Sequence, residues 1–529
     1  MNVESRPATA ATRPDEPDEL DRRIAELAAR YRPLAVEILR EAIRIPADLV
    51  DRPDDEGGDP RAGLSNHERE RLEMLRDRIV EIGAVATADD VRTDEFGNVV
   101  WVVQDHTDGI DPDDKKVIYL DGHSDTVQAL RDQWHAKLGG AVDPYDGLID
   151  VDALDPDALR AELGYVPPED QWEHLVFGRG AADQLAGVVS QIIATKILLE
   201  LAPAGALRGV IVRAYATVAE EDNDGGAPRY LVSHVLPGAP PRLVPDVVIL
   251  TEGTGDSEKG ALGIYRGQRG RMQIEVTVVG RSCHGSMPHL GLNPFEHGAA
   301  IVAEAADQAV TVGFGQHDFL GAGTRTASWS VLDTPSDCAV PDRLTFRFDR
   351  RLTVGESPEQ ALAEIEGLDA VARARAAGLT VDVHVPTYDE PTRTGFVPGN
   401  PQIYPSWVTP EDHPAIAAAA DAYRRVVTPH VDEPAGGATA GALRREPRVD
   451  RWVFSTDGVG FPIPADDATI DVGASKNWVT SGAMKHPAMF GIGAGLEQNT
   501  HRIGEYVDAR ELEHAIAVLA RFPSLFATT

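Results

Sequence analysis

The sequence predicts an α/β fold in which a smaller α/β lid domain is inserted into a larger domain with a mostly parallel sheet. Apolar runs ending at Leu120, Val218 and Leu250 alternate with helical patterns, and this alternation is typical of a parallel sheet. From about Gly267 a second set of strands and helices begins, and a loop rich in Pro, Thr and Gly ends it. The 529 residues also exceed one ordinary core, so at least two domains are expected.

The domain boundaries are placed where this pattern shifts. Residues 1–19 are rich in Pro, Ala, Thr and acids without an apolar period, so we expect them to be disordered. We predict four parts: an acidic N-terminal tail and helix (1–60), a first part of the large domain (61–266), the lid (267–390) and a second part of the large domain (391–529).

The N-terminal part is expected to contain a helix over residues 19–45, whose pattern is interrupted at Pro33, and a Gly- and Asp-rich loop over Pro53–Ser65 follows it. The acidic stretch 128–177 reads as an insertion or active-site loop with a short helix over 155–164. Around it we predict two helices and four strands: helices near His67–Ile82 and Gln184–Leu201, and strands near Asn98–Val103, Lys116–Leu120, Val210–Val218 and Val247–Leu250.

The lid is expected to alternate strands and helices over about 120 residues, which suits a small separate α/β domain. Its predicted elements are a strand over 271–280, a helix over Asn293–Val312, a strand over 343–352, a helix over 357–378 and a strand over 379–385.

Composition excludes several classes of partner. The formal net charge is −35, so neither nucleic acid nor an anionic membrane is expected as a partner, because both require a basic surface. With two cysteines, Cys283 and Cys338, the chain has no disulfide framework. The first twenty residues lack the features of a signal peptide, and no run of about 18 apolar residues is present to span a bilayer. We therefore expect a cytoplasmic protein.

Residues able to bind metal occur where the predicted strands end. The apolar run before Gly122 leads into His123 and Asp125, which point to the same side of a strand. Five more residues that can bind metal occur at the ends of predicted elements. They are Asp183 before a helix, the pair Glu220 and Glu221 after a strand, Glu252 after another strand, and His501 after a glycine-rich run. Two histidines and several carboxylates at the carboxyl edge of one sheet predict a two-metal site.

Each of these residues also has a simpler explanation. Asp183 alone would be read as a helix N-cap, and Glu220 with Glu221 as a solvated surface pair. His501 alone would be an ordinary exposed histidine near the C-terminus. The metal interpretation depends on the whole set, in which one carboxylate must remain free of metal to transfer a proton.

The order of the motifs resembles a known family. HSDTV, GRGAADQ, the Glu-Glu pair, TEG and the late histidine follow each other as in the ArgE/DapE-type di-metal hydrolases, which include acetylornithine deacetylase and succinyl-diaminopimelate desuccinylase. YRGQRGRMQI, SCHGSMP and DRRLTVGE resemble the branch of selenium-metabolism-linked hydrolases. The resemblance covers the chain from about Glu68 onward, and it implies a metallohydrolase domain whose lid mediates dimerisation.

This resemblance implies a role for each metal-site residue. His123 and Glu252 would hold one ion, Glu221 and His501 the other, and Asp183 would bridge them. Glu220 would act as general base and acid, and Asp125 would orient the ring of His123.

Two lid residues are implied in catalysis as well. His284 matches a histidine that crosses the dimer interface to stabilise the oxyanion in the partner's site, and its alternative is a surface loop residue. Arg351 matches an arginine that meets the substrate's carboxylate, and its alternative is a salt bridge at a strand edge. Arg266, Arg269 and Arg271 are expected to be structural charges at the lid hinge.

The sequence departs from the family pattern in three places. His501 is followed by Arg-Ile-Gly-Glu where the family often has Pro-Asn-Glu, and His486 is a rival ligand. We prefer His501 because the preceding glycine run and Glu505 fit a ligand loop better. The stretches 128–177 and 458–486 are longer than the family's usual loops, and both could wall the active site.

The predicted activity is metal-dependent hydrolysis of an amide bond in a small substrate, such as an N-acyl amino acid or a dipeptide. An N-carbamoyl or aryl-amine aminohydrolase would use the same metal centre, and a non-catalytic dimeric binding protein is the alternative from another class. Two divalent ions are the expected cofactors, with Zn as the first choice and Co or Mn compatible with the ligand set. We expect a homodimer formed through the lid.

Overall fold

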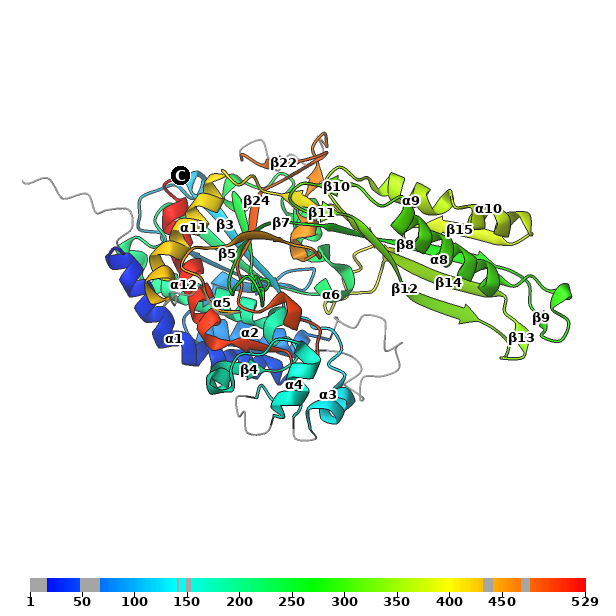
Figure 1. Cartoon of the computed structure of the whole chain (residues 1–529). Helices are drawn as coiled ribbons and strands as arrows, with labels where there is room; N and C mark the ends of the chain where they lie inside the picture. The colour runs from blue at the N-terminus through cyan, green and yellow to red at the C-terminus, as the bar shows by residue number, and fades with distance from the viewer. Residues whose placement is uncertain (1–16, 48–66, 140–141, 149–153, 432–440, 468–475) are drawn as a thin grey trace, which may run out of the picture.

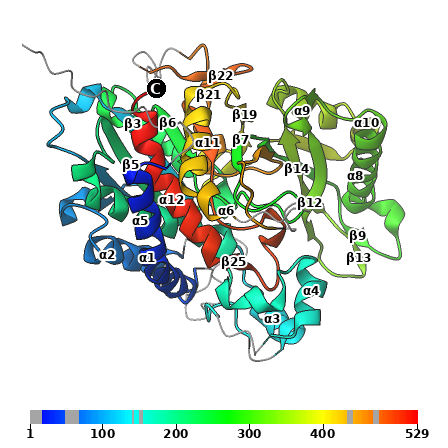
Figure 2. The ribbon, with the colours of Figure 1, turned by 60° about the vertical axis from the view of Figure 1, so that its left-hand side comes forward.

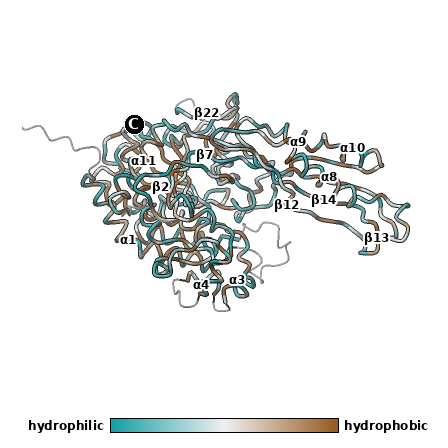
Figure 3. The backbone as a smooth tube through the Cα atoms, in the orientation of Figure 1, coloured by the Kyte–Doolittle hydropathy of each residue, from teal (hydrophilic) through white to brown (hydrophobic). Residues whose placement is uncertain are grey.

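The computed structural model describes residues 17–47, 67–139, 142–148, 154–431, 441–467 and 476–529. The loop expected over Pro53–Ser65 and nearly all of the tail expected to be disordered lie outside these residues. Figure 1 shows a large body from which the lid extends as an elongated arm, with the strands labelled β9 and β13 at its far tip. The tube in Figure 3 shows hydrophobic and hydrophilic segments alternating along the chain in both the body and the arm.

The body is built on one mixed sheet. Its strand order is β1-β2-β5-β3-β6-β24-β7-β19, with β20 paired to β7. The central strands β5, β3, β6 and β24 run parallel, whereas both flanks pair antiparallel. The bounds are β1 (Val91–Thr93), β2 (Val99–Gln104), β3 (Lys116–His123), β5 (Val210–Thr217), β6 (Val247–Leu250), β7 (Ile264–Gln268), β19 (Trp407–Val408), β20 (Val449–Trp452) and β24 (Ala488–Gly491). On one flank β20 also pairs parallel with β7, so the sheet is mixed, and its continuous parallel part is at the centre, where the predicted site residues lie.

The helices of the body pack together beside this sheet, as Figure 2 shows for α1, α5, α11 and α12. Pro33 lies inside α1 without ending it, contrary to the expected interruption, and the helix has a buried face that includes Ile24, Ile38 and Leu39. The bounds are α1 (Glu19–Ile43), α2 (Arg69–Glu81), α5 (Ala186–Glu200), α6 (Glu220–Asn223), α7 (Gly226–Tyr230), α11 (Pro414–Val426) and α12 (Ala509–Phe526).

Among the described residues, the segment Ala181–Glu200 passes a length and hydropathy test for a membrane span, although none was expected. In the folded chain 83% of its apolar window is buried. The segment therefore has the environment of a core helix, which is apolar on every side because protein surrounds it.

The lid has its own antiparallel sheet and its own hydrophobic core. The strand order is β12-β14-β8-β15, and β18 also pairs with β8. Alternate residues of β8 and β14 are buried, among them Ile274, Val276, Phe346 and Phe348, and they pack with the lid helices in one cluster. The bounds are β8 (Gly270–Val279), β9 (Cys283–His284), α8 (Pro294–Thr311), β10 (Gln316–His317), β11 (Gly321–Ala322), β12 (Thr324–Asp333), β13 (Ala339–Val340), β14 (Arg343–Leu352), α9 (Pro358–Glu366), α10 (Asp369–Ala376) and β15 (Thr380–His384).

The lid differs from the sequence prediction in its shorter elements and in one strand and one helix. The short strands β9, β10, β11 and β13 were not predicted, nor was β12, whose residues are mostly exposed at the edge of the sheet. The helix expected over 357–378 is two helices, since α9 ends at Glu366 and α10 begins at Asp369. The chain returns to the body through β16 (Thr387–Tyr388), β17 (Asn400–Pro401) and β18 (Ile403–Tyr404).

The stretch 128–177 folds into a small subdomain rather than an open loop. It contains α3 (Arg131–Leu138), the predicted short helix as α4 (Pro156–Leu163), and β4 (Leu175–Phe177), which pairs with β25 (Tyr506–Asp508). Its core joins Trp134, Leu159 and Trp172 to the C-terminal segment through Leu496, Ile503 and Tyr506. This subdomain therefore supports the loop that carries His501.

The other long stretch, 458–486, forms a small sheet in the order β21-β23-β22 beside the hinge. Its strands are β21 (Ile463–Pro464), β22 (Val479–Ser481) and β23 (Met484–His486). Ser481 bonds both the backbone N–H and the carbonyl of Val408 in β19, at 3.0 Å each.

We expect Leu159→Ala to loosen the His501 loop. Leu159 is fully buried and its methyl group lies against the backbone of Gly504, so its removal leaves a cavity that costs about 2–5 kcal/mol. Hydrogen exchange of residues 496–506 should accelerate, whereas Leu130→Ala, at a position 41% exposed, should leave that segment unchanged. Equal protection of the segment in both variants would contradict the supporting role of the subdomain.

Candidate metal centre

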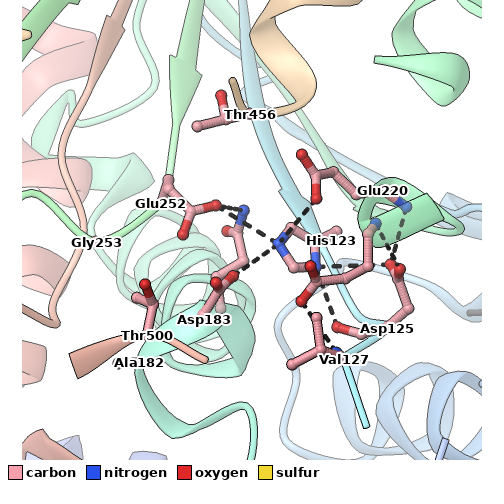
Figure 4. A network of polar contacts seen from close by, with 12 residues as sticks. His123, Asp125, Val127, Ala182, Asp183, Glu220, Glu252, Gly253, Thr456 and Thr500 are labelled. Atoms are coloured by element: carbon pink, nitrogen blue, oxygen red, sulfur yellow. Dashed lines mark hydrogen bonds and ion pairs between the residues drawn. The ribbon is translucent and has the colours of Figure 1, made fainter. Parts of the chain in front are cut away.

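The carboxyl ends of three neighbouring parallel strands bring most of the predicted ligands together. His123 is the last residue of β3, Glu252 follows β6, and the turn with Glu220 and Glu221 follows β5. Because β5, β3 and β6 are adjacent and parallel, these residues meet at one edge of the sheet. Figure 4 shows the carboxylates of Glu220, Glu252 and Asp183 directed toward the ring of His123.

Asp183 lies between the two halves of the site and is not a helix N-cap. Its backbone dihedrals are non-helical, and α5 begins only at Ala186. The backbone N–H groups of Ala182 and Asp183 donate to Oε1 of Glu505, at 2.9 and 3.1 Å. The Glu505 carboxylate is in turn paired with Arg179 at 2.6 Å, and all these groups are buried. A rigid hydrogen-bonded frame therefore sets the position of the Asp183 carboxylate.

The ligand atoms form two sets that share Asp183. His123, Asp183 and Glu252 make one set, and Asp183, Glu221 and His501 make the other, with the ligand atoms of each set within 4.8 Å of one another. Oδ1 of Asp183 lies 3.1 Å from Nε2 of His123, whereas Oδ2 lies 3.0 Å from Nε2 of His501. One carboxylate thus presents one oxygen to each set, which is the arrangement that a bridging ligand requires.

The electrostatics of the site also fit cations. Burial and the nearby Asp183 raise the pKa of Glu252 to about 8, and the charge of Glu221 raises the pKa of His501 to about 12. Burial opposes the charged form of His123, but bonds to surrounding carboxylates nonetheless raise its pKa well above the ordinary value. Without a metal the cluster therefore keeps protons, and divalent cations would replace them. Nitrogen and carboxylate donors of this kind suit Zn, Co or Mn.

Asp125 contacts His123 mainly through its backbone. Nδ1 of His123 lies 3.1 Å from the carbonyl oxygen of Asp125 and 3.6 Å from its carboxylate, which is beyond a hydrogen bond. The carboxylate accepts instead from the backbone N–H groups of Glu220 and Glu221, at 3.2 and 2.9 Å. Asp125 therefore anchors the turn that bears these glutamates, and its carbonyl orients the ring.

Several buried residues of the site were missed in the sequence. Gln184 donates from Nε2 to Oε2 of Glu252 at 2.7 Å, next to Asp183 in the GRGAADQ motif. Asp457 accepts from Thr217 at 2.7 Å, and burial together with this Asp457 raises the pKa of Asp121. Asp121 stands two residues before His123 on the same strand, which is the signal that could have identified it. Asp457 carried no such signal.

His486 is not available as a ligand. Its ring is fully buried, with Nε2 2.8 Å from the hydroxyl of Ser481 and Nδ1 2.7 Å from the carbonyl of Pro487. Burial lowers its pKa to about 4. His501, by contrast, lies in one of the two ligand sets, so the structure favours His501 over its rival.

The two lid residues are not brought to the cluster by their own chain. His284 is exposed in β9, at the tip of the lid far from the body in Figure 1. Arg351 lies at the base of the lid, where Asp349 accepts from its Nε and Nη2 at 2.7 and 3.1 Å and Ser455 accepts from Nη1 at 2.8 Å. Arg351 thus faces the body with its guanidinium already bonded.

Comparison with known sequences assigns the family. Residues 266–369 match the M20 peptidase dimerisation domain. The chain is 30% identical over 476 residues to the uncharacterized protein YgeY of Escherichia coli K12, an alignment that covers 87% of this chain and 95% of YgeY. The chain belongs to the M20 family. A succinyl-diaminopimelate desuccinylase of Cupriavidus necator is 25% identical over 274 residues, covering 51% of this chain and 60% of that enzyme. The predicted ArgE/DapE-type family is confirmed, and the selenium-linked branch stays a prediction.

Solved structures of M20-type proteins share the fold. The dipeptidase Dug1p of Saccharomyces cerevisiae aligns with a TM-score of 0.60 at 12% identity, covering 96% of this chain and 99% of that chain. The YXEP protein of Bacillus subtilis, a dinuclear metal binding peptidase from the M20 family, aligns with a TM-score of 0.53 at 14% identity, covering 95% and 99%. The predicted α/β metallohydrolase fold with an inserted lid domain is confirmed, and the chain is a metal-dependent hydrolase of this family.

Metal binding at pH 7 is expected to release roughly two to three protons per chain, because Glu252, His501 and His123 hold protons in the metal-free site. Metal affinity should therefore rise as the pH increases from 6 to 8. Calorimetric titration in buffers of different ionisation enthalpy measures the released protons. Glu252→Gln should release about one proton fewer, and a binding heat independent of the buffer would contradict this electrostatic description.

Proposed function

We propose that this M20 hydrolase cleaves the amide bond of a small N-acyl amino acid or dipeptide. The observation that carries the proposal is the pair of ligand sets joined at Asp183, with a further buried carboxylate, Glu220, 3.8 Å from His123. The desuccinylase removes a succinyl group held by an amide bond, and Dug1p cleaves the amide bond of a dipeptide, so both relatives support this substrate class. We place the enzyme in the cytoplasm.

Two divalent ions, Zn first and Co or Mn as alternatives, would be held by His123, Glu252, Glu221 and His501 with Asp183 between them. When bound, such ions polarise the scissile carbonyl and lower the pKa of water toward 7.

Glu220 is the proposed general base and acid. It belongs to neither ligand set among the described residues, although it is buried beside His123. Burial raises the pKa of its carboxyl group well above the ordinary value, which suits a group that must both accept and return a proton. It would take a proton from the attacking water and return it to the leaving nitrogen.

The lid would complete the site in a homodimer. Nδ1 of His284 accepts from the backbone N–H of Ser286 at 3.1 Å, which leaves Nε2 as the donor for an oxyanion in the partner's site. Arg351 would bind the substrate's carboxylate, with Asp349 orienting its guanidinium and Ser455 marking the position the anion would take.

A turnover screen tests the activity. The metal-loaded protein is incubated with N-acetyl and N-succinyl amino acids, dipeptides, N-carbamoyl amino acids and aryl amines, and the released amine, ammonia and carbon dioxide are measured. Release of amino acid with a carboxylate supports the proposal. Release of carbon dioxide with ammonia, or of ammonia alone, would identify an N-carbamoyl or aryl-amine aminohydrolase instead, and absence of turnover with every class would overturn it.

Glu220→Gln should lower kcat by about 10²–10⁴-fold, because the amide cannot transfer the proton. The bound metal should stay at the wild-type level, since Glu220 belongs to neither ligand set. Metal analysis beside steady-state kinetics checks both points. Near-normal turnover with a full metal complement would exclude the proton-transfer role.

Mixing two inactive variants tests the contribution of His284 across the dimer. Glu220→Gln and His284→Ala should each be nearly inactive, but a mixed dimer has one site with both residues intact. Since about half of the dimers are mixed after exchange, about a quarter of wild-type activity should return. A mixture that stays inactive after verified subunit exchange would show that His284 serves its own chain or none.

A further inference from the structure

The turn with the two catalytic-site glutamates is held at both ends by other parts of the chain. At its start, Asp125 accepts from the N–H groups of Glu220 and Glu221, and Val127 N–H donates to Oε1 of Glu221 at 3.1 Å. α6 has a single turn, so it has little stability of its own. Its exact placement must therefore come from the groups that contact it.

At its other end, Asn223 is bound by the segment that returns from the lid. Its side chain is fully buried, and Oδ1 accepts from Nε2 of Gln402 and the hydroxyl of Tyr404 at 2.7 Å each and from Nδ2 of Asn400 at 3.0 Å. Nδ2 of Asn223 donates back to Asn400 at 3.1 Å. One buried amide thus joins the turn to three residues about 180 positions further along the chain.

The next residue, Asp224, is bound by the strand that leads into the lid. Its carboxylate is paired with Arg271 of β8 and accepts from the hydroxyl of Ser455. Arg271 also bonds Asp349 of β14 at 3.1 Å. The N–H of Asp224 donates to the carbonyl of Glu220 at 2.6 Å, and its φ of +43° is a conformation that persists only when the surroundings impose it.

The two hinge strands that make these contacts are also joined to each other. β18 pairs with β8, with Ile403 opposite Met272 and Tyr404 opposite Arg271. A rotation of the lid would therefore move both anchors of the turn together, and the carboxylates of Glu220 and Glu221 would move with them.

We propose that the lid hinge positions the catalytic turn, with Asn223 and Asp224 as the positioning residues and Tyr404, Gln402 and Arg271 as their partners on the two hinge strands. This inference rests on the proposed function, in which Glu221 holds one metal ion and Glu220 transfers the proton. According to this proposal, the lid does more than cover the metal site: its orientation also determines the positions of two residues of that site. Arg271, expected from the sequence to be a structural hinge charge, acquires this positioning role.

The test removes hinge donors without altering the turn itself. Tyr404→Phe combined with Gln402→Met eliminates two of the three donors to Asn223. We expect the ion bound by Glu221 and His501 to weaken about tenfold, while the ion bound by His123 and Glu252 keeps its affinity, because supporting residues of a metal ligand typically contribute that much. Two-step calorimetric titration with Zn measures both affinities, and His501→Ala and Glu252→Gln assign the steps.

Tyr423→Phe is the matched control. Its hydroxyl is buried and donates to the carbonyl of Arg444 at 2.7 Å, and it lies on α11, which is neither the turn nor a hinge strand. This variant should keep both metal affinities. At the contact between Asp224 and Arg271, Arg271→Met should weaken the binding of the ion held by Glu221 and His501. Arg271→Lys should restore most of this affinity because the positive charge is kept.

Kinetics provide a second reading. In the Tyr404→Phe/Gln402→Met variant kcat should fall about tenfold with KM within twofold of wild type, since the base is displaced but Arg351 and its partners Asp349 and Ser455 are unchanged. Unchanged affinity of the second ion in a folded hinge variant, or an equal loss in Tyr423→Phe, would overturn the inference. If the wild-type protein binds two ions but hydrolyses no amide, the proposed function fails while the metal titration still decides the role of the hinge.

Discussion

The site depends on the placement of one carboxylate, that of Asp183. It has to lie within reach of a histidine from the centre of the sheet and of another from the end of the chain, and it meets Nε2 of each at about 3 Å. A charged group in a buried position is costly unless its environment is fixed and polar. Glu505 and Arg179 supply that environment. The Glu505 carboxylate accepts from the backbone N–H groups of Ala182 and Asp183 and is itself paired with Arg179. The rest of the centre is arranged around this point.

The ligands differ in how firmly the sheet holds them. His123 ends a strand that is buried at every position after Lys116, and Glu252 follows a fully buried strand, so the parallel centre places both. His501 and the turn of Glu220 and Glu221 lie in loops, and loops need support from outside the sheet. The subdomain over 128–177 packs against the His501 loop, and the hinge strands bind the turn. The long insertion and the lid therefore both contribute to the precision of the metal centre.

The sequence was informative wherever function follows a strand end. β6 and β14 were predicted to the residue, and His123, Asp183, Glu221, Glu252 and His501 all lie in the ligand sets. It failed where the structure depends on long-range contacts. The residues of β12 are mostly exposed because it is an edge strand, and the buried Asp457 begins a short 3-10 helix, Asp457–Gly460, without a motif. From the sequence alone Asn223 and Asp224 are ordinary turn residues. Their hydrogen-bond and ion-pair partners, Asn400, Gln402 and Arg271, are distant in sequence, so no local pattern indicates them.

In the proposed dimer the two ends of the lid would contribute to two different sites. Its tip lies far from its own body, so in the proposed dimer the tip serves the neighbouring site, while its base is bonded to the catalytic turn of its own chain. Dimerisation through the lids would fix the arms against each other, and any closing motion would then occur at the hinge. Because the hinge strands also hold the turn, such a motion would bring the partner's His284 toward the substrate and adjust Glu220 in the same step. A rigid lid whose tip contacts the partner's site and whose base binds the catalytic turn of its own chain can in this way couple oxyanion binding to the placement of the base.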